Sequence, residues 1–327
     1  MPGRPDPKAR ARLAALAAIL GLGAVPPGVI PTGAAQSVGA ECAVPAEATP
    51  SPPTPVPPTP TPVAYSDATP AATPVPPPPP TPDPQAVLAD ELEAVAAALA
   101  ACLTGGEAEG VVALATDRYL GQLFGGGEPL PAAAYRAVAP ELDVVPVRIV
   151  SFRDARRSGA GAEAEVVSVV GNQLLRGRWR FVQAPPSERD PGRTGWRVDA
   201  EAPLEVEPPP GATPLEVTLQ EYAIGIEPTV AGTDVVLRGA NLGAEDHEML
   251  VLRFDDGLTT GDLLRATGPG LPEGIAYVGQ ATVPAGDEAE LVLTDLEPGT
   301  YTVVCLLPTA QGVPHLALGM AASFEVE

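Results

Sequence analysis

The sequence predicts a multidomain chain in which an α+β domain is followed by an all-β sandwich, and three observations support this. A stretch of 41 residues, Val44 to Pro84, contains 18 prolines and cannot form a core. The middle segment, 85–207, begins with helical periodicity and then turns to strand-like runs, which is the α+β order. The C-terminal segment, 214–327, consists mainly of strand-like runs separated by turn residues, as in a sandwich. At about 150 residues per domain, 327 residues have room for two such units.

The N-terminus has the features of an export signal. Three basic residues precede an apolar run of 13 residues, 13–25, and small residues follow at Gly33–Ala35. We therefore expect a signal peptide over 1–40 and a secreted or cell-surface bacterial protein. An uncleaved anchor is the alternative, and it would be the only attachment to a membrane. A lipidated Cys42 is disfavoured, because Glu41 stands where lipoproteins have a small residue.

Residues 41–84 are expected to be a disordered linker rich in proline and threonine. Such composition favours extended polyproline II, which rises about 3.1 Å per residue. The linker would then reach on the order of 100 Å and hold the folded domains away from a wall or membrane.

The middle segment is expected to contain three helices and then a meandering sheet. The helices are predicted over 84–106, 107–124 and 131–142, and the strands over 144–155, 161–171, 173–183 and 195–207. This element order, together with "CLTGGEAEGVVALATDRYL" (102–120), resembles the nuclear transport factor 2-like family. The resemblance implies a cone-shaped α+β fold over 85–207.

Catalysis in the middle segment is not indicated. It contains no histidine, the residue that general acid–base chemistry uses most often. Asp117, Tyr119 and Tyr135 are explained by a helix end and by a core, so no catalytic residue is assigned. We expect a binding or spacer module, and the chain as a whole is more consistent with a non-enzyme.

The C-terminal segment is expected to be a sandwich of about seven strands. Its strand-like runs are 215–226, 233–241, 247–254, 288–296, 299–307 and 322–327, with one helical interruption over 259–268. It has 18 acidic residues against three arginines, which leaves a net charge of −15.

Potential metal ligands gather in this same segment. Both histidines of the chain are here, His247 and His315, and "CLLPTAQGVPHLALGM" runs from Cys305 to Met320. A thiolate, two imidazoles and a thioether are the ligand types of blue-copper sites. Each is also an ordinary core residue, since unbound cysteine is among the most buried types. Because the chain has three cysteines, at least one thiol is unpaired within it.

The segment resembles the cupredoxins, the plastocyanin and azurin type of copper protein. There one histidine follows an Asn-x-Gly stretch, here Asn241 to Gly243, and the other ligands come from the loop between the last two strands. The resemblance implies one copper ion with His247, Cys305 and His315 as strong ligands and Met320 as the weak axial one. It also implies single-electron transfer or copper holding.

One departure from the cupredoxin pattern leaves two alternatives open. Nine residues separate Cys305 from His315, where blue copper proteins have a shorter gap. If the insert forms a small hairpin, it can return His315 to the metal. Otherwise Cys305 is a buried thiol, and the chain is a metal-free surface module that binds a ligand or a protein. Met249 shares a strand face with His247, which makes it an alternative soft neighbour of the metal, but it is expected in the core.

The charge restricts the partners. The net charge is −22 and Lys8 is the only lysine, whereas nucleic-acid binding requires basic patches. A basic redox protein is the expected partner, and the oligomeric state is left open.

Overall fold

The computed structural model describes residue 42 and residues 83–124, 128–184, 195–227, 229–266 and 270–327. The predicted signal peptide (1–40) and nearly all of the predicted linker (41–84) lie outside these residues. Within the described ranges, no helix combines the length and apolar character needed to cross a membrane.

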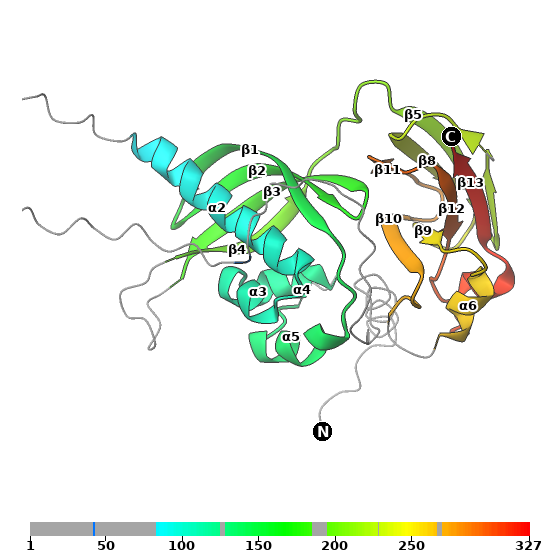
Figure 1. Ribbon diagram of the computed structural model, residues 1–327, viewed down its shortest axis with the longest axis horizontal. Coiled ribbons are helices and arrows are strands. Elements are labelled where there is room, and N and C mark those ends of the chain that lie inside the picture. Colours follow the sequence, from blue (N-terminus) through cyan, green and yellow to red (C-terminus); the bar gives the residue numbers. More distant parts are fainter. Residues whose placement is uncertain (1–41, 43–82, 125–127, 185–194, 228, 267–269) are drawn as a thin grey trace, which may run out of the picture.

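The middle unit begins with helices that cover one side of a sheet (Figure 1). They are α2 Pro84–Thr104, α3 Ala108–Leu114, α4 Asp117–Leu123 and α5 Ala132–Val138, continued by the 3-10 turn η1 Ala139–Glu141. The prediction of a single helix over 107–124 is wrong. Ala115 is extended and forms a bridge to Val198, and the Thr116 hydroxyl caps the next helix by accepting from Tyr119 N–H at 3.3 Å.

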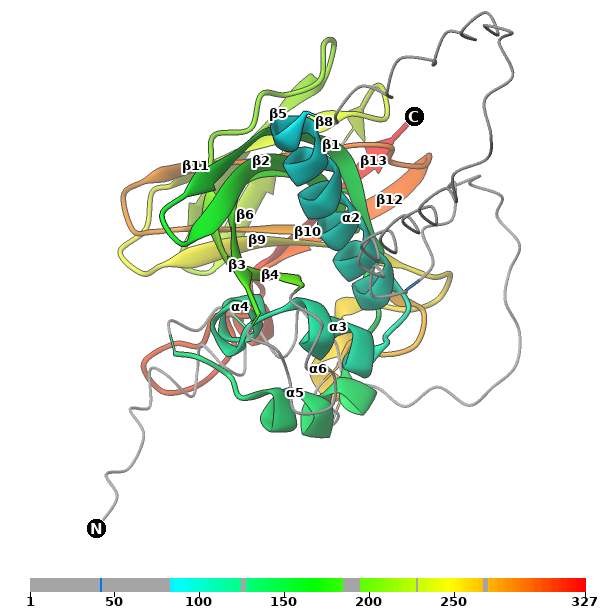
Figure 2. The same cartoon turned by 90° about the vertical axis from the view of Figure 1, so that its left-hand side faces the viewer.

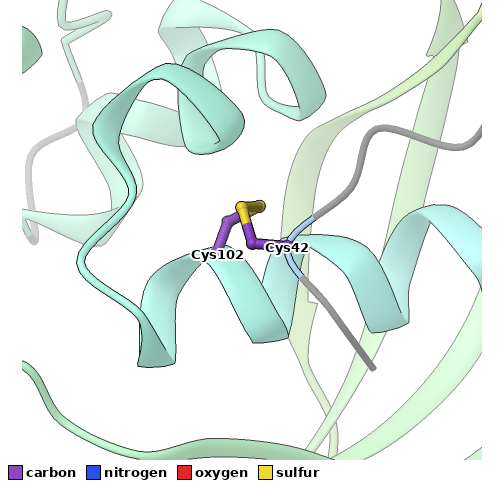
Figure 3. Close-up of a disulfide and its surroundings, with 2 residues drawn as sticks. All are labelled: Cys42 and Cys102. Carbon is purple, nitrogen blue, oxygen red and sulfur yellow. A yellow bond between two sulfur atoms is a disulfide. The ribbon is translucent and has the colours of Figure 1, made fainter. Parts of the chain in front are cut away.

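Helix α2 is fixed at both ends. The Asp83 side chain accepts from Gln85 N–H and Pro84 occupies the first turn, where its missing N–H costs nothing. Near the other end, Cys102 forms a disulfide with Cys42 (Figure 3). Cys305 is therefore the free thiol expected from the cysteine count, and it is buried.

Four antiparallel strands complete the middle unit: β1 Val147–Ser158, β2 Gly161–Val170, β3 Gln173–Gln183 and β4 Trp196–Pro203. Figure 2 shows α2 lying across this sheet. Tyr119 and Tyr135 are buried in the core between helices and sheet, as the sequence predicts. The α+β order is confirmed, and the nuclear transport factor 2-like assignment stays a prediction.

The C-terminal unit is a β-sandwich. Its elements are β5 Thr213–Gln220, β6 Ala223–Ile226, β7 Thr229–Val230, β8 Val235–Asn241, β9 His247–Phe254, α6 Thr260–Arg265, β10 Ile275–Val283, β11 Glu288–Leu293, β12 Gly299–Val304, η2 His315–Leu318 and β13 Ala321–Val326. The run 215–226 is divided into two strands that pair with each other. Strands β7 and β10 are additions to the predicted set.

Two sheets form the layers of the sandwich. One has the order β10-β9-β12-β13-β7. The other continues from the middle unit, in the order β1-β2-β3-β11-β8-β5-β6, because Leu293 of β11 pairs with Gln173 of β3. The core between the layers contains Leu237 and Leu291 from one sheet and Val251 from the other. The predicted all-β sandwich is thus confirmed, and β3 joins it to the middle unit.

Candidate metal centre

Three potential metal ligands, far apart in the chain, meet in the sandwich. His247 is the first residue of β9, Cys305 follows the last residue of β12, and His315 opens η2. Because β9 and β12 are antiparallel neighbours, with Leu250 opposite Val304, the start of one strand lies beside the end of the other. The Nδ1 atoms of the two histidines are 3.1 Å apart, and Cys305 Sγ is 3.4 Å from His315 Nδ1. All three side chains are fully or almost fully buried.

The insert between Cys305 and His315 folds back on itself. Pro308 and Pro314 form a bridge, and Thr309 N–H donates to the carbonyl of Val313 at 2.8 Å. On returning, His315 N–H donates to the Leu307 carbonyl at 3.0 Å. The expected small hairpin is present, and it brings His315 back to Cys305 in spite of the long gap.

Met320 is attached to the same loop by its backbone. Its N–H donates to the His315 carbonyl, and its carbonyl accepts from Cys305 N–H, both at 3.2 Å. Gly319 makes this turn with a φ of 103°, a conformation that favours glycine. The Met320 side chain is buried in the same core cluster as Cys305, and so is Met249.

The turn before His247 is organised by Asn241, a buried side chain. Its Nδ2 donates to the carbonyls of Glu245 and Val283, both at 2.9 Å, and its Oδ1 accepts from Gly243 N–H at 2.9 Å. Asn241 thereby fixes the path of the chain into β9, whose first residue is His247.

Two carboxylates face the outer nitrogens of the histidine rings. His315 Nε2 is 3.0 Å from Glu245 Oε2, and His247 Nε2 is 3.8 Å from Glu221 Oε1. Among the described residues neither Nε2 has a hydrogen bond of normal geometry, so we treat both contacts as electrostatic. The Tyr222 ring packs against the His315 ring, with centroids 4.9 Å apart.

These carboxylates favour one tautomer of each ring. A proton on Nε2 is attracted to the nearby carboxylate, and it leaves Nδ1 with a lone pair. Burial lowers the pKa of both histidines, so the doubly protonated, charged ring is disfavoured. Two Nδ1 lone pairs would then face each other at 3.1 Å, an arrangement that a cation between them stabilises.

Without a cation the same geometry has a cost. One of the two Nδ1 atoms must then carry a proton in order to donate to the other. A neutral ring protonated at Nδ1 has a lone pair at Nε2, and this lone pair faces a carboxylate. The Cys305 thiol stays protonated, because burial, with the charge of Glu248, raises its pKa to about 12. A bound cation would let both imidazoles keep their proton on Nε2, next to the carboxylates, and would take the place of the thiol proton. Histidine binds a metal as neutral imidazole and cysteine binds it as thiolate.

The donor spacing fits a single metal ion. With bonds of about 2.0 Å to nitrogen and about 2.3 Å to sulfur, three donors in a trigonal plane are about 3.5 to 3.7 Å apart. The observed separations of 3.1 and 3.4 Å are within a few tenths of an ångström of this, and all three donor atoms lie within 4.8 Å of one another. Together with Met320, these residues form a group consistent with one type-1 copper site.

Sequence reasoning missed the acidic residues around the donors. Glu221 and Glu245 were two of the 18 acids of the segment, and only the fold shows that they face the histidines. Glu248, unlike these two, is buried, and burial raises its pKa to about 7. No sequence signal distinguishes these three from the other acidic residues of the segment. In the middle unit, Asp117 accepts from Ala132 N–H at a helix end, as expected of a structural residue.

Comparisons with known proteins gave distant structural similarity. No protein-family model matches the chain, and no curated protein matches it either. A reduced auracyanin from the photosynthetic bacterium Roseiflexus castenholzii is 20% identical over 36% of this chain and 99% of its own, with a TM-score of 0.26. Auracyanin B is 18% identical over 38% of this chain and 93% of its own, with a TM-score of 0.28. A multicopper oxidase from Campylobacter jejuni is 12% identical over 55% of this chain and 50% of its own, with a TM-score of 0.24. Since these TM-scores are below 0.5, the case for a metal depends on the donor atoms themselves.

Proposed function

We propose that this chain is an exported, cupredoxin-like copper protein that transfers single electrons or holds copper. The observation that carries the proposal is the convergence of two buried Nδ1 atoms and one buried thiol, while carboxylates face the outer nitrogens. His247, Cys305 and His315 would be the strong ligands and Met320 the axial one. Copper, when bound, would supply a one-electron couple between Cu(I) and Cu(II).

The donor set favours copper over zinc. Structural zinc sites are closed by four strong ligands in a tetrahedron. Here the cluster contains three strong donors among the described residues, and the fourth candidate, Met320, is a weak thioether. A trigonal set with a weak axial thioether suits both oxidation states of copper.

The protein's own residues would prepare the site before the metal arrives. The hairpin after Cys305 fixes His315, and the turn held by Asn241 fixes His247. The backbone of Met320 is hydrogen-bonded to the backbones of both Cys305 and His315. Such a preformed site holds the same donor positions in both oxidation states, so little reorganisation accompanies electron transfer. The electron would come from a reduced partner and pass to an oxidised one.

A basic redox protein fits as that partner. The segment 214–327 has a net charge of −15, and Glu221 and Glu245 lie next to the proposed ligands. Complementary charge accelerates encounter, and salt screens it. The association rate should therefore fall as ionic strength rises.

The test is metal binding by the purified, metal-free full chain. We expect about one copper per chain, and a large loss of affinity in His247→Ala and in His315→Ala, since each removes a strong ligand. Met320→Leu should keep copper bound but raise the reduction potential, because a weak donor to Cu(II) is lost. Met249→Leu is the matched control, a buried methionine of the same core that should leave the potential unchanged. Tighter binding of zinc than of copper, or no binding of either, would contradict the proposal.

A further inference from the structure

Glu248 is a buried acid that has no place among the proposed ligands. It follows His247 on β9, so its side chain lies on the opposite face of the strand. Only 1% of its surface is exposed. Its Oε1 accepts from Leu306 N–H at 2.7 Å, and its Oε2 accepts from Gln280 Nε2 at 2.7 Å. Leu306 directly follows Cys305, so one carboxylate oxygen holds the backbone next to the thiol.

Gln280 is held in turn by the middle unit. Gln173 of β3 donates through Nε2 to the Gln280 carbonyl at 2.9 Å, and its Oε1 accepts from Gln280 N–H at 3.0 Å. Tyr277 O–H also donates to Gln173 Oε1, at 3.1 Å. The Gln173 side chain therefore binds the backbone of β10 at two points, as a neighbouring strand would.

A glycine allows this close approach of the two units. A Cβ at Gly279 would lie 2.7 Å from the Leu293 side chain and 3.1 Å from Cβ of Gln173. Any larger residue there would separate β10 from β3 and β11. Asn172 adds a further hydrogen bond between the two units, since its Nδ2 donates to the Thr294 carbonyl at 2.9 Å.

We propose that Gln173, acting through Gln280 and Glu248, positions the Leu306 amide and with it the Cys305 turn. The middle unit is then a positioning element of the candidate metal centre as well as a spacer. Each link is a hydrogen bond of 2.7 to 3.0 Å between residues that are buried or partly buried, where water competes poorly. The effect on copper rests on the proposed function, whereas the chain of hydrogen bonds does not.

Two substitutions interrupt the chain at different links. Gln280→Met removes the donor to Glu248, and Gln173→Met removes the two bonds to β10; both keep a side chain of similar length. Gln122→Met is the matched control. Gln122 makes the same pair of bonds to the backbone of Glu201, at 3.2 and 3.0 Å, within the middle unit.

The first measurement is amide hydrogen exchange in the metal-free full chain. We expect the Leu306 amide to exchange about five- to tenfold faster in Gln173→Met and Gln280→Met, the effect of losing roughly one hydrogen bond. The amide of Leu237, in the centre of β8, serves as the reference for global stability. Gln122→Met should not change the ratio of the two rates. The proposal is wrong if, in Gln173→Met or in Gln280→Met, the exchange rate of the Leu306 amide rises no more than that of the Leu237 amide.

Glu248 itself provides a second, independent comparison. Glu248→Gln keeps an oxygen that can accept from Leu306 N–H, and Gln280 can rotate its amide to pair with the new side chain. Glu248→Leu keeps neither bond. We therefore expect slow Leu306 exchange in Glu248→Gln and fast exchange in Glu248→Leu, and equal rates in these two variants would overturn the positioning role.

The copper measurement separates this inference from the proposed function. We expect copper affinity to fall about tenfold in Gln173→Met and Gln280→Met, as when a residue that orients a metal ligand is lost, and the thiolate absorption band to shift. A wild-type chain that binds no copper, but whose Leu306 amide responds as expected, would refute the function and retain the hydrogen-bond chain. Normal copper binding and an unshifted band in both variants would refute the positioning role alone.

Discussion

Asn241→Ala should destabilise the sandwich and weaken metal binding together. The substitution removes three hydrogen bonds of 2.9 Å from a side chain that is 2% exposed. At about 1 kcal/mol net for each bond, the loss is about 3 kcal/mol in the free energy of unfolding. Because these bonds fix the turn before His247, we also expect weaker copper binding in the folded protein.

The assay must report on the sandwich itself. Both tryptophans, Trp179 and Trp196, are in the middle unit, so tryptophan fluorescence would follow the wrong part of the chain. Hydrogen exchange measured by mass spectrometry on peptides from 235–254 gives the local free energy directly. Gln122→Ala is the control, since its two bonds hold the middle unit instead. A loss below about 1 kcal/mol in the sandwich, or an equal loss from the control, would refute the role of Asn241.

Three further predictions concern protons and the disulfide. Copper affinity should rise at least tenfold per pH unit between about pH 6.5 and 8, because binding displaces one proton from the Cys305 thiol while both histidines are already neutral, and Glu248, with a pKa of about 7, gains negative charge beside the site over this range; titrations showing no pH dependence would contradict this. Hydrogen bonds from Arg176 and Arg153 lower the pKa of Glu165 from 4.5 to about 2, so its stabilisation is complete above pH 4.5 and is lost as the pH falls toward 2. Urea unfolding at pH 6 and pH 3 should show a smaller pH effect in Glu165→Gln than in wild type, and equal effects would argue against this ion pair. Cys42→Ser should cost up to about 4 kcal/mol in the middle unit, from the entropy of a closed loop of 60 residues, and an unchanged urea midpoint under oxidising conditions would count against the cross-link.

Most strands could be predicted because runs of apolar residues, alternating with polar ones in β5 and continuous in β9, are separated by glycine, proline or aspartate. The bounds predicted for 247–254 and 173–183 agree with those of β9 and β3. Strand β10 was missed because its pairing with β9 shifts register between Tyr277 and Gly279, which interrupts the alternation. The helix over 107–124 was predicted as one although Thr116 is a preferred N-cap residue type, and the bridge from Ala115 to Val198 imposes the break just before it.

The donor residues of the site were visible in the sequence, but their surroundings were not. Rare residue types at expected strand ends singled out His247, Cys305 and His315, and the fold brings these three together. The positions of Glu245 and Glu248 relative to the site depend on contacts between elements far apart in the chain. The pairing of Gln173 with Gln280 is likewise a contact between the two units, for which a single sequence holds no signal.

The most direct test is a Cu(II) titration of the metal-free full chain, followed by visible absorption, in wild type and in Cys305→Ser. We expect about one copper per wild-type chain and an intense thiolate charge-transfer colour. Cys305→Ser should bind more weakly and show no such colour, because the thiolate is its source. A wild-type chain that binds no copper, or a Cys305→Ser chain that gives the same spectrum as wild type, would contradict the copper site and leave Cys305 as a buried structural thiol.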